Sequence, residues 1–412
     1  MGAINRAPTA ASPSVGARFI APTAARPSSR ELLTVFLLCG AVILLLYVFG
    51  TMRVGLQKDD AGQYYRMAEE PAYLARLPYS FRVLTPGLAG FWPSDPVAGF
   101  TVVAMVALPL AATALYAYQR AIDLGHPAAL AGALLFAVSG GSVRMLTTPV
   151  YVDAVTYLTE AAAFWLLARR QFWPFVAVVT LGVLNRETAL LLVAVYLAIE
   201  PPTRTTWKRG AVAVLLLGMV LAVDIVAKLA AGGVLSGATP LSVLAPFART
   251  FQQTLPPLAD LFDVYSMLGV LWLLAARRLP GPTAFQRRAL VYAALVILQL
   301  TVSRGDEGRN LSHLFPVVIP LAMLEVQRAL GVGGRRGPVL ATLLVLACAA
   351  SMVHARWTIV EPAALRYGLV AAGTVAALGI AWGLPFVRGT RPAPVTGSAD
   401  ALPSASSRPD AG

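Results

Sequence analysis

The sequence predicts an all-α protein, a polytopic bundle of transmembrane helices, on three observations. The 412 residues are 57% hydrophobic and 13% charged, whereas soluble domains carry about 25% charged residues. Mean hydropathy is +0.69, and the apolar runs lack the alternating polarity of membrane β-barrel strands. Because lipid offers the backbone no hydrogen-bond partner, each apolar run is expected to form a helix, which pairs its own N–H and C=O groups.

The apolar runs divide the chain into one membrane domain, 30–387, between two tails. Residues 1–29 and 388–412 are rich in Ala, Pro, Ser, Thr and Gly, a composition that predicts disorder. The run at 32–50 is longer than the roughly 7 to 15 residues of a signal-peptide core, so we expect an uncleaved first span. About ten full spans are expected, near 31–50, 97–118, 127–143, 154–168, 210–230, 262–276, 289–303, 311–327, 338–355 and 367–386.

The segment 172–199 differs from the other apolar runs. Runs of about a dozen residues, 172–184 and 188–199, flank Asn185-Arg186-Glu187-Thr188, and each is short of the roughly 20 residues needed to cross a bilayer. We expect two half-helices that meet at a polar elbow. Polar, non-helical backbone at membrane depth is tolerated only beside protein or a water-filled cavity, so the elbow indicates a cavity.

The basic residues predict the orientation. Most of the 33 Lys and Arg fall in inner segments if the N-terminus is cytoplasmic, which is the bias expected of cytoplasmic loops. Both tails are therefore expected in the cytoplasm. The net charge of +13 comes from short basic pairs at helix ends, without the basic stripe of a nucleic-acid-binding protein, so no nucleic-acid partner is expected.

On this topology, four polar clusters share the non-cytoplasmic side. They lie in the first outer loop at 51–96, after Val150, at the elbow, and in the loop before the span at 311–327. The candidate site residues in these clusters are Asp59, Asp60, Tyr64, Arg82, Asp153, Asn185, Arg186, Glu187, Asp306, Glu307, Arg309 and His313. Their shared side predicts one functional site at the outer face.

Short motifs in these clusters resemble a known superfamily. They are Lys58-Asp59-Asp60-Ala61-Gly62-Gln63-Tyr64-Tyr65, Pro78-Tyr79-Ser80-Phe81-Arg82-Val83-Leu84-Thr85-Pro86, Asn185-Arg186-Glu187-Thr188, and Asp306-Glu307-Gly308-Arg309 before a helix with Phe315-Pro316. Together they resemble bacterial multi-spanning proteins of the GT-C glycosyltransferase superfamily, in particular members linked to cell-surface glycopolymers. The resemblance covers about residues 30–385, and its motifs are short and degenerate.

The resemblance implies an activity and a place for it. Such enzymes transfer a sugar from a polyprenyl-phosphate donor to a glycan or lipid acceptor on the outer side of the inner membrane, usually with inversion, using an acid in the first outer loop. Asp59 or Asp60 matches that acid. A carboxylate that takes the proton of the acceptor hydroxyl is typically worth about 10²- to 10⁴-fold in rate. The second acid either tunes its neighbour's pKa or holds a divalent cation, and both acids also suit the N-terminus of a helix expected over 61–76.

The other candidates have two readings each. Arg82, Arg186 and Arg309 suit a donor phosphate, because guanidinium binds phosphate oxygens through a planar fork. Arg186 is equally explained by an ion pair with Glu187 or Glu160, and Arg82 by snorkelling at the interface. His313 is read as a hydrogen-bonding partner of the site or as a structural histidine. Tyr64 stacks on a sugar or lipid, or anchors the loop at the interface.

The alternative function is a secondary transporter or flippase of a lipid-linked or small polar substrate. Half-helices that meet in the membrane are typical of transporter sites, usually in repeated halves. No second half-helix pair is visible, and the first outer loop has no counterpart, which disfavours a carrier. The sequence also lacks a Walker motif, a dinucleotide fingerprint, zinc-ligand spacing and a serine-nucleophile elbow, so no cofactor is expected beyond a possible divalent cation.

Overall fold

The structure is a computed structural model, and the parts of the chain that it describes are helical. It describes residues 27–50, 60–70, 73, 79, 82–92, 94–199, 210–219, 222, 258–279, 283–300, 307–353 and 363–384. No strand occurs within these ranges. The all-α prediction is therefore confirmed for the described residues.

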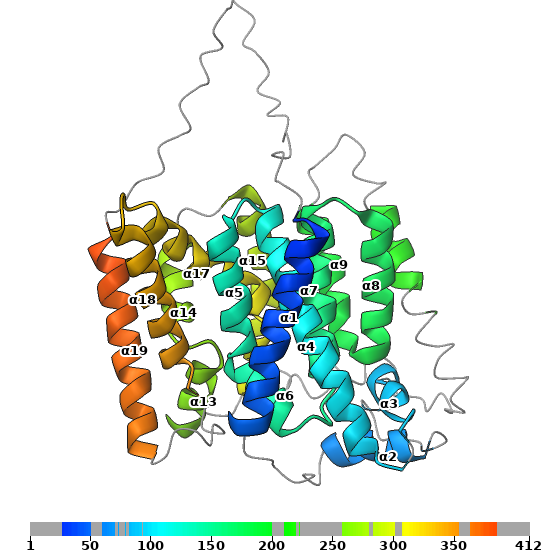
Figure 1. The fold of residues 1–412 in the computed structure, drawn as a ribbon. Helices are drawn as coiled ribbons and strands as arrows, with labels where there is room; N and C mark the ends of the chain where they lie inside the picture. Colours follow the sequence, from blue (N-terminus) through cyan, green and yellow to red (C-terminus); the bar gives the residue numbers. More distant parts are fainter. Residues whose placement is uncertain are drawn as a thin grey trace, which may run out of the picture.

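Besides an apolar helix at Gly210–Met219, the described residues form a series of elements, most of them labelled in Figure 1. They are α1 (Ser29–Leu45) with the π-helical turn η1 (Leu46–Gly50), α2 (Asp60–Glu69), α3 (Leu84–Ala89), α4 (Pro96–Ala121), α5 (His126–Ala137), α6 (Gly140–Thr147), α7 (Asp153–Ala168), α8 (Phe172–Asn185), the 3-10 turn η3 (Glu187–Leu190), α9 (Leu191–Ile199), α13 (Leu258–Leu268), α14 (Leu271–Arg278), α15 (Ala284–Leu300), α16 (Glu307–Ser312), α17 (Phe315–Leu330), α18 (Arg336–Ser351) and α19 (Ala363–Gly383).

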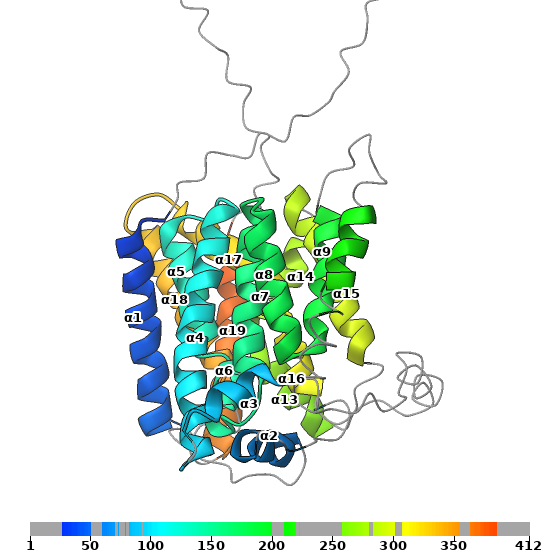
Figure 2. The same cartoon turned by 90° about the vertical axis from the view of Figure 1, so that its right-hand side faces the viewer.

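The longer helices run side by side as a bundle with two distinct ends. Figures 1 and 2 both show the start of α1 and the end of α19 at one end, drawn at the top. The short helices α2, α3, α6, α13 and α16 gather at the other end. We call this lower end the site end, and the upper end the opposite end. Segments far apart in the sequence therefore meet at the site end.

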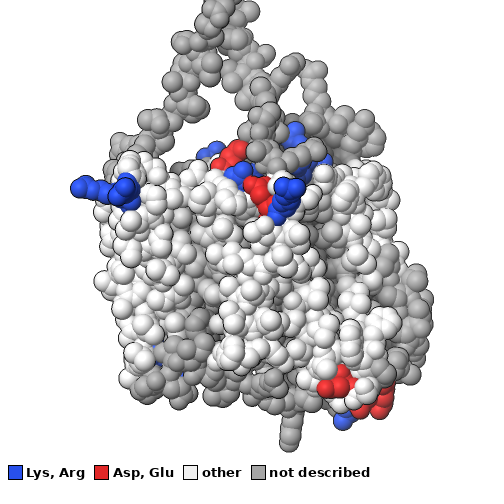
Figure 3. Space-filling model, viewed as in Figure 1, with Lys and Arg blue, Asp and Glu red and all other residues white. Residues whose placement is uncertain are grey.

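The bundle has the composition and surface of a membrane-embedded protein. Among the described residues, four helical segments are long and apolar enough to cross a bilayer, namely Ser29–Phe49, Pro96–Ala121, His126–Thr147 (α5 and α6 together) and Ala364–Gly383. Large apolar side chains such as Leu37, Leu346 and Val375 are 59%, 60% and 71% exposed. Figure 3 shows charged side chains near the two ends of one face, with a broad uncharged belt between them. Such a belt suits lipid, where exposed apolar side chains need no protein partner.

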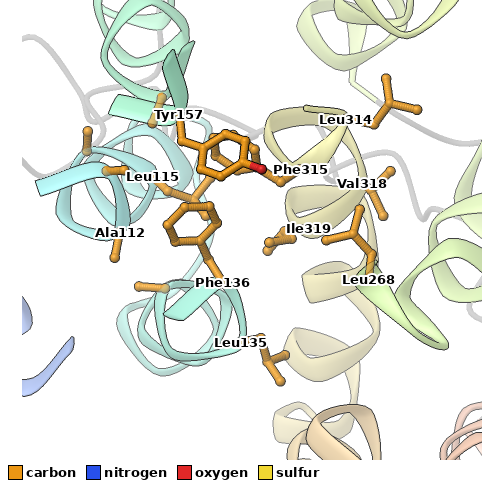
Figure 4. Close-up of a cluster of buried hydrophobic side chains, with 14 of the residues drawn as sticks. Ala112, Leu115, Leu135, Phe136, Tyr157, Leu268, Leu314, Phe315, Val318 and Ile319 are labelled. Carbon is orange, nitrogen blue, oxygen red and sulfur yellow. The ribbon is translucent and has the colours of Figure 1, made fainter. Parts of the chain in front are cut away.

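Aromatic side chains fill the core behind the site end. The rings of Phe136 and Phe315 lie 4.6 Å apart between centroids, and Tyr157 packs against both at 5.9 and 5.6 Å. Figure 4 shows these rings between α5, α7 and α17, with Leu115 and Ile319 beside them. Tilted and edge-on aromatic pairs of this kind contribute about 0.5–1.5 kcal/mol beyond their buried area. The core thus fixes α7 against α17, which carry parts of the site.

Helix boundaries differ from the sequence prediction in several places, among them Gly269 (φ 52°), where the span expected at 262–276 is divided into α13 and α14. The helix expected over 61–76 ends at Glu69, because Pro71 follows and the residue before a proline avoids the helical region. The span expected at 127–143 is broken into α5 and α6 at Ser139, whose hydroxyl accepts from the backbone N–H of Ser142 at 3.4 Å. Local capping, which hydropathy does not register, sets the boundary at Ser139.

Candidate functional site

Five segments of the chain bring the candidate residues together at the site end. They are α2, the residues just before α3, the start of α7, the junction of α8 and η3, and α16 with the turn that follows it. Hydrogen bonds and ion pairs join side chains as many as 249 residues apart in the sequence. The candidate site is therefore a product of the tertiary fold.

Asp153 is the centre of the site. Its side chain is 1% exposed, and it begins α7, where the helix dipole favours a negative charge. Arg186 Nη1 donates to Oδ1, Arg309 Nε lies 3.5 Å from Oδ2, and His313 Nε2 lies 3.1 Å from Oδ1. A carboxylate buried this deeply is costly unless it is paired and hydrogen-bonded. Two guanidinium groups and an imidazole supply that pairing.

The elbow directs Arg186 inward. Arg186 has an extended backbone (φ −159°, ψ 129°) that ends α8, and its side chain is 3% exposed. Its Nη2 donates to Asn310 Oδ1 at 2.8 Å. The expected ion pair with Glu187 or Glu160 is wrong, because the partner of Arg186 is Asp153. The extended residue turns the guanidinium toward α7 rather than along the helix axis.

Asn185 fastens the elbow to α7 and to the first outer loop. Its Nδ2 donates to Val152 O at 2.8 Å and to Thr156 Oγ1 at 2.9 Å, while Thr85 Oγ1 donates to its Oδ1. Gly182 lets α8 approach this closely, because a Cβ there would lie 2.3 Å from Thr159 Cγ2. A fully bonded, buried amide of this kind fixes the backbone around it.

Asp60 lies where the site reaches the surface, which we call its mouth. Its side chain is 24% exposed, against 1% for Asp153, the other acid paired with Arg309 among the described contacts. Tyr79 donates its hydroxyl to Oδ1 at 2.5 Å, and Arg309 Nη2 donates to Oδ2 at 3.2 Å. The Arg309 guanidinium also lies 4.6 Å from the centroid of the Tyr151 ring. Arg309 therefore connects the partly exposed Asp60 to the buried Asp153.

Arg82 ties the first outer loop to the elbow. Its Nε and Nη2 donate to the two carboxylate oxygens of Glu187 at 3.0 and 2.5 Å, a bidentate geometry. Its Nη1 donates to the hydroxyl of Tyr64 at 2.5 Å. The side chain of Arg82 is 7% exposed and that of Glu187 38%. The snorkelling reading of Arg82 is therefore wrong, because the guanidinium turns into the protein.

Tyr64 and Tyr79 of the first outer loop keep their protons at neutral pH. Burial raises the pKa of Tyr64 to about 12, although Arg82 opposes the shift. Burial also raises the pKa of Tyr79, and the hydrogen bond to Asp60 raises it further. Tyr79 is thus a fixed hydrogen-bond donor to Asp60.

His313 and Glu160 form the innermost part of the site. His313 Nδ1 lies 2.8 Å from Glu160 Oε1, and the two side chains are 6% and 3% exposed. Glu160 follows Asp153 by seven residues, which places both on one face of α7. Glu160 was absent from the candidate set, and so were Tyr79, Thr85 and Asn310. A lone acid in an apolar helix is itself a signal of function and would have identified Glu160.

Part of the candidate set lies outside the described residues. Asp59 and Asp306 are not described, and Glu307 is described only as the first residue of α16. No group of three or more His, Cys, Asp and Glu among the described residues has an arrangement that holds a metal ion. Asp59 and Asp306 lie outside those residues, so a divalent cation stays a prediction.

Comparison with known proteins adds no assignment: no protein-family model and no curated protein matches the chain. The function is therefore argued from the site alone. Its described parts are a partly exposed carboxylate, a guanidinium group bound to it, and a buried network of ion pairs behind them.

Proposed function

We propose that the protein is a membrane glycosyltransferase of GT-C type, which transfers a sugar from a polyprenyl-phosphate donor to a glycan or lipid acceptor. One observation carries the proposal: the partly exposed Asp60 is bound by Arg309, which also contacts the buried Asp153. A base for the acceptor and a cation for the departing phosphate are thus side by side. Inverting transfer needs both groups.

Asp60 is the proposed general base. The acceptor hydroxyl oxygen bonds to the anomeric carbon, its proton passes to Asp60, and the bond from that carbon to the phosphate oxygen breaks. Each carboxylate oxygen has two lone-pair positions, and each oxygen of Asp60 accepts one described hydrogen bond, from Tyr79 or Arg309. Lone pairs therefore remain for the proton, while the two donors fix the direction of the carboxylate.

Arg309 is the proposed contact to the donor phosphate, and Arg186 is its support. Arg309 reaches the mouth through Asp60, whereas Arg186 is held inside by Asp153 and Asn310. Arg82 is held by Glu187 and shapes the loop. Negative charge that develops on the leaving phosphate is stabilised by a preorganised guanidinium in a site with little water.

The membrane arrangement belongs to the same proposal. About ten spans, with both tails in the cytoplasm of a bacterium and the site on the outer face of the inner membrane, would place Asp60 beside lipid-linked donors. The separation of the site end from the end where α1 begins and α19 finishes supports it. A divalent cation at Asp59 or Asp306 would assist the phosphate as a Lewis acid.

The test compares glycan and lipid-linked sugar profiles of cells that carry wild type, Asp59→Asn or Asp60→Asn at equal membrane abundance. Glu69→Gln is the matched control, because Glu69 is an exposed acid on the same helix as Asp60. We expect Asp60→Asn to lower product by about 100-fold or more, and Glu69→Gln to leave it unchanged. Unchanged profiles in both aspartate variants would remove the base assignment.

A transporter or flippase is the second candidate, favoured by the row of acid, histidine and acid in Asp153, His313 and Glu160. Such rows conduct protons in some membrane carriers. The same cells separate the two functions: a carrier would leave the lipid-linked substrate unmodified on one leaflet, whereas a transferase variant accumulates both donor and acceptor.

A further inference from the structure

The Glu160–His313 pair lies behind the groups that the proposed chemistry uses. Both side chains are nearly inaccessible, at 3% and 6% exposed. Glu160 Oε1 lies 2.8 Å from His313 Nδ1, and its Oε2 has no hydrogen-bond partner in the part of the chain that the structure describes. Arg186 and Arg309 bind Asp153 instead. An ionised glutamate buried in a membrane bundle is unfavourable without a positive partner, and His313 is the group in position to be one.

The second ring nitrogen of His313 faces a carboxylate as well. His313 Nε2 lies 3.1 Å from Asp153 Oδ1, and Arg186 Nη1 donates to the same oxygen. Nε2 and Nη1 are 2.8 Å apart, closer than two N–H donors on one oxygen usually lie, so Arg186 opposes a proton on Nε2. A neutral ring with its proton on Nδ1 would accept from Arg186 at Nε2, and it would no longer donate to Asp153.

We propose that His313 is an imidazolium that donates one N–H to Glu160 and the other to Asp153, and that the pair positions Asp153 between Arg186 and Arg309. The proton on His313 thus gives Asp153 Oδ1 two donors, His313 and Arg186, while Arg309 Nε completes the ion pairing 3.5 Å from Oδ2. Its loss would turn Nε2 into an acceptor for Arg186 Nη1, 2.8 Å away, and would remove one donor from Asp153. His313 and Glu160 are positioning residues, which act on Arg309 through Asp153.

The groups around His313 favour the charged ring on balance. From α7 it meets Asp153, Glu160 and the ring of Tyr157, whose centroid is 4.9 Å away. From the elbow it meets the guanidinium of Arg186. From α15, the phenol of Tyr292 lies near Glu160. The turn after α16 holds the backbone of His313, whose main-chain N–H donates to Asn310 O at 3.3 Å. Two carboxylates in contact outweigh one guanidinium.

The test measures the protonation of both His313 ring nitrogens by ¹⁵N NMR, on full-length protein with ¹⁵N-labelled histidine in lipid bilayers. The chain has three histidines, so His126→Gln and His354→Gln leave His313 as the sole signal. At about pH 8.5, two units above the ordinary histidine value of about 6.5, we expect both ring nitrogens to be protonated. In Glu160→Gln the ring should become neutral at that pH. A neutral ring in the otherwise unchanged protein would overturn the proposal, whatever the variants do.

A charge-compensation series gives a second measurement. His313→Gln removes the cation from between two acids, so we expect a lower thermal unfolding midpoint. Glu160→Gln in the same chain removes one acid, so the double variant should regain part of the loss. A double variant as unstable as the sum of the two single variants would contradict the charge coupling.

The role of the pair in aiming Arg309 rests on the proposed function, but the proton does not. If His313 is protonated but the Asp60→Asn variant has normal glycans, the transferase proposal is rejected and the protonation of His313 stands. If His313 is neutral but Asp60→Asn is inactive, the protonation is rejected and the transferase proposal stands. If both hold, His313→Gln should raise the concentration of lipid-linked donor needed for half-maximal transfer, as expected when Asp153 no longer holds Arg309.

Discussion

Both ends of the bundle surround a buried acid with arginines, but the charge balance is opposite. At the opposite end, Glu325 is completely buried and lies 2.7, 2.8 and 4.0 Å from Arg278, Arg328 and Arg277. These arginines occupy the last turns of α14 and α17, where the helix dipole favours a positive charge. Three arginines to one acid is the surplus expected of a cytoplasmic face.

At the site end, acids outnumber the arginines joined to them. Asp60 and Asp153 share Arg186 and Arg309, whereas the third acid, Glu160, pairs with His313 instead of an arginine, and Asp60 is partly exposed. The pairing also comes from four stretches of chain rather than two neighbouring helix ends. The difference teaches that a cluster of arginines does not by itself indicate a functional site. The stronger indication is an extra acid that is bound to the cluster and is partly exposed.

The largest expected effect is at the centre of the site. Asp153→Ala leaves Arg186, Arg309 and His313 buried without their shared carboxylate, which costs about 3–5 kcal/mol of stability. We expect a much lower unfolding midpoint in detergent and no sugar transfer. Asp153→Asn keeps the shape and one acceptor oxygen, so it should unfold later than the alanine variant and still be inactive. A stable, active Asp153→Asn would show that its charge does not organise the site.

The second prediction is for the opposite end of the bundle, where Glu325→Gln removes the charge of the acid shared by three arginines. The three arginines around it are 16–18% exposed and can turn toward water, so the loss should be smaller, about 1–3 kcal/mol. Thermal unfolding should register this loss, while transfer per folded molecule stays at the wild-type rate. A selective loss of transfer would show that the two ends are functionally coupled.

The third prediction concerns the close approach of α8 to α7. Gly182→Ala introduces a Cβ 2.3 Å from Thr159 Cγ2, and such overpacking costs about 1–3 kcal/mol. Thr159→Ser removes that methyl group, so the double variant should be more stable than Gly182→Ala alone. Strictly additive losses in the double variant would place the strain elsewhere.

The smallest effect is expected from Tyr79→Phe. Asp60 loses one donor but is partly open to water, so transfer should fall only about tenfold, as for one hydrogen bond to a charged group. Because the pKa of Tyr79 is raised by burial and by Asp60, the phenol stays protonated at pH 9. The basic limb of the pH–rate profile should therefore be the same in wild type and variant, and a limb that vanished in Tyr79→Phe would contradict this.

The sequence predicted the helices and the polar clusters that contain most of the site residues. Apolar runs predicted the helices, because hydropathy reports directly on burial in lipid. The break at Arg186 followed from two short apolar runs around a charged tetrapeptide, and the structure has extended backbone there. Helix ends were less accurate, because capping by Ser139 and the proline after Glu70 act locally.

The pairing within the site could not be predicted in the same way. The sequence offered Arg186 two possible partners, Glu187 beside it and Glu160 on the preceding span. Arg186 instead pairs with Asp153. Glu187 instead faces Arg82, which is 105 residues away. Which guanidinium meets which carboxylate depends on the rotation of each helix, and this rotation is set by packing such as that at Gly182.

The most direct test of the account measures sugar transfer by purified Asp60→Asn and Glu325→Gln in vesicles of membrane lipid that contains the native lipid-linked donors, with rates normalised to folded protein. The account predicts that Asp60→Asn is slower by about 100-fold or more, and that Glu325→Gln matches wild type. Equal rates in Asp60→Asn and wild type, in vesicles where wild type is active, would contradict it.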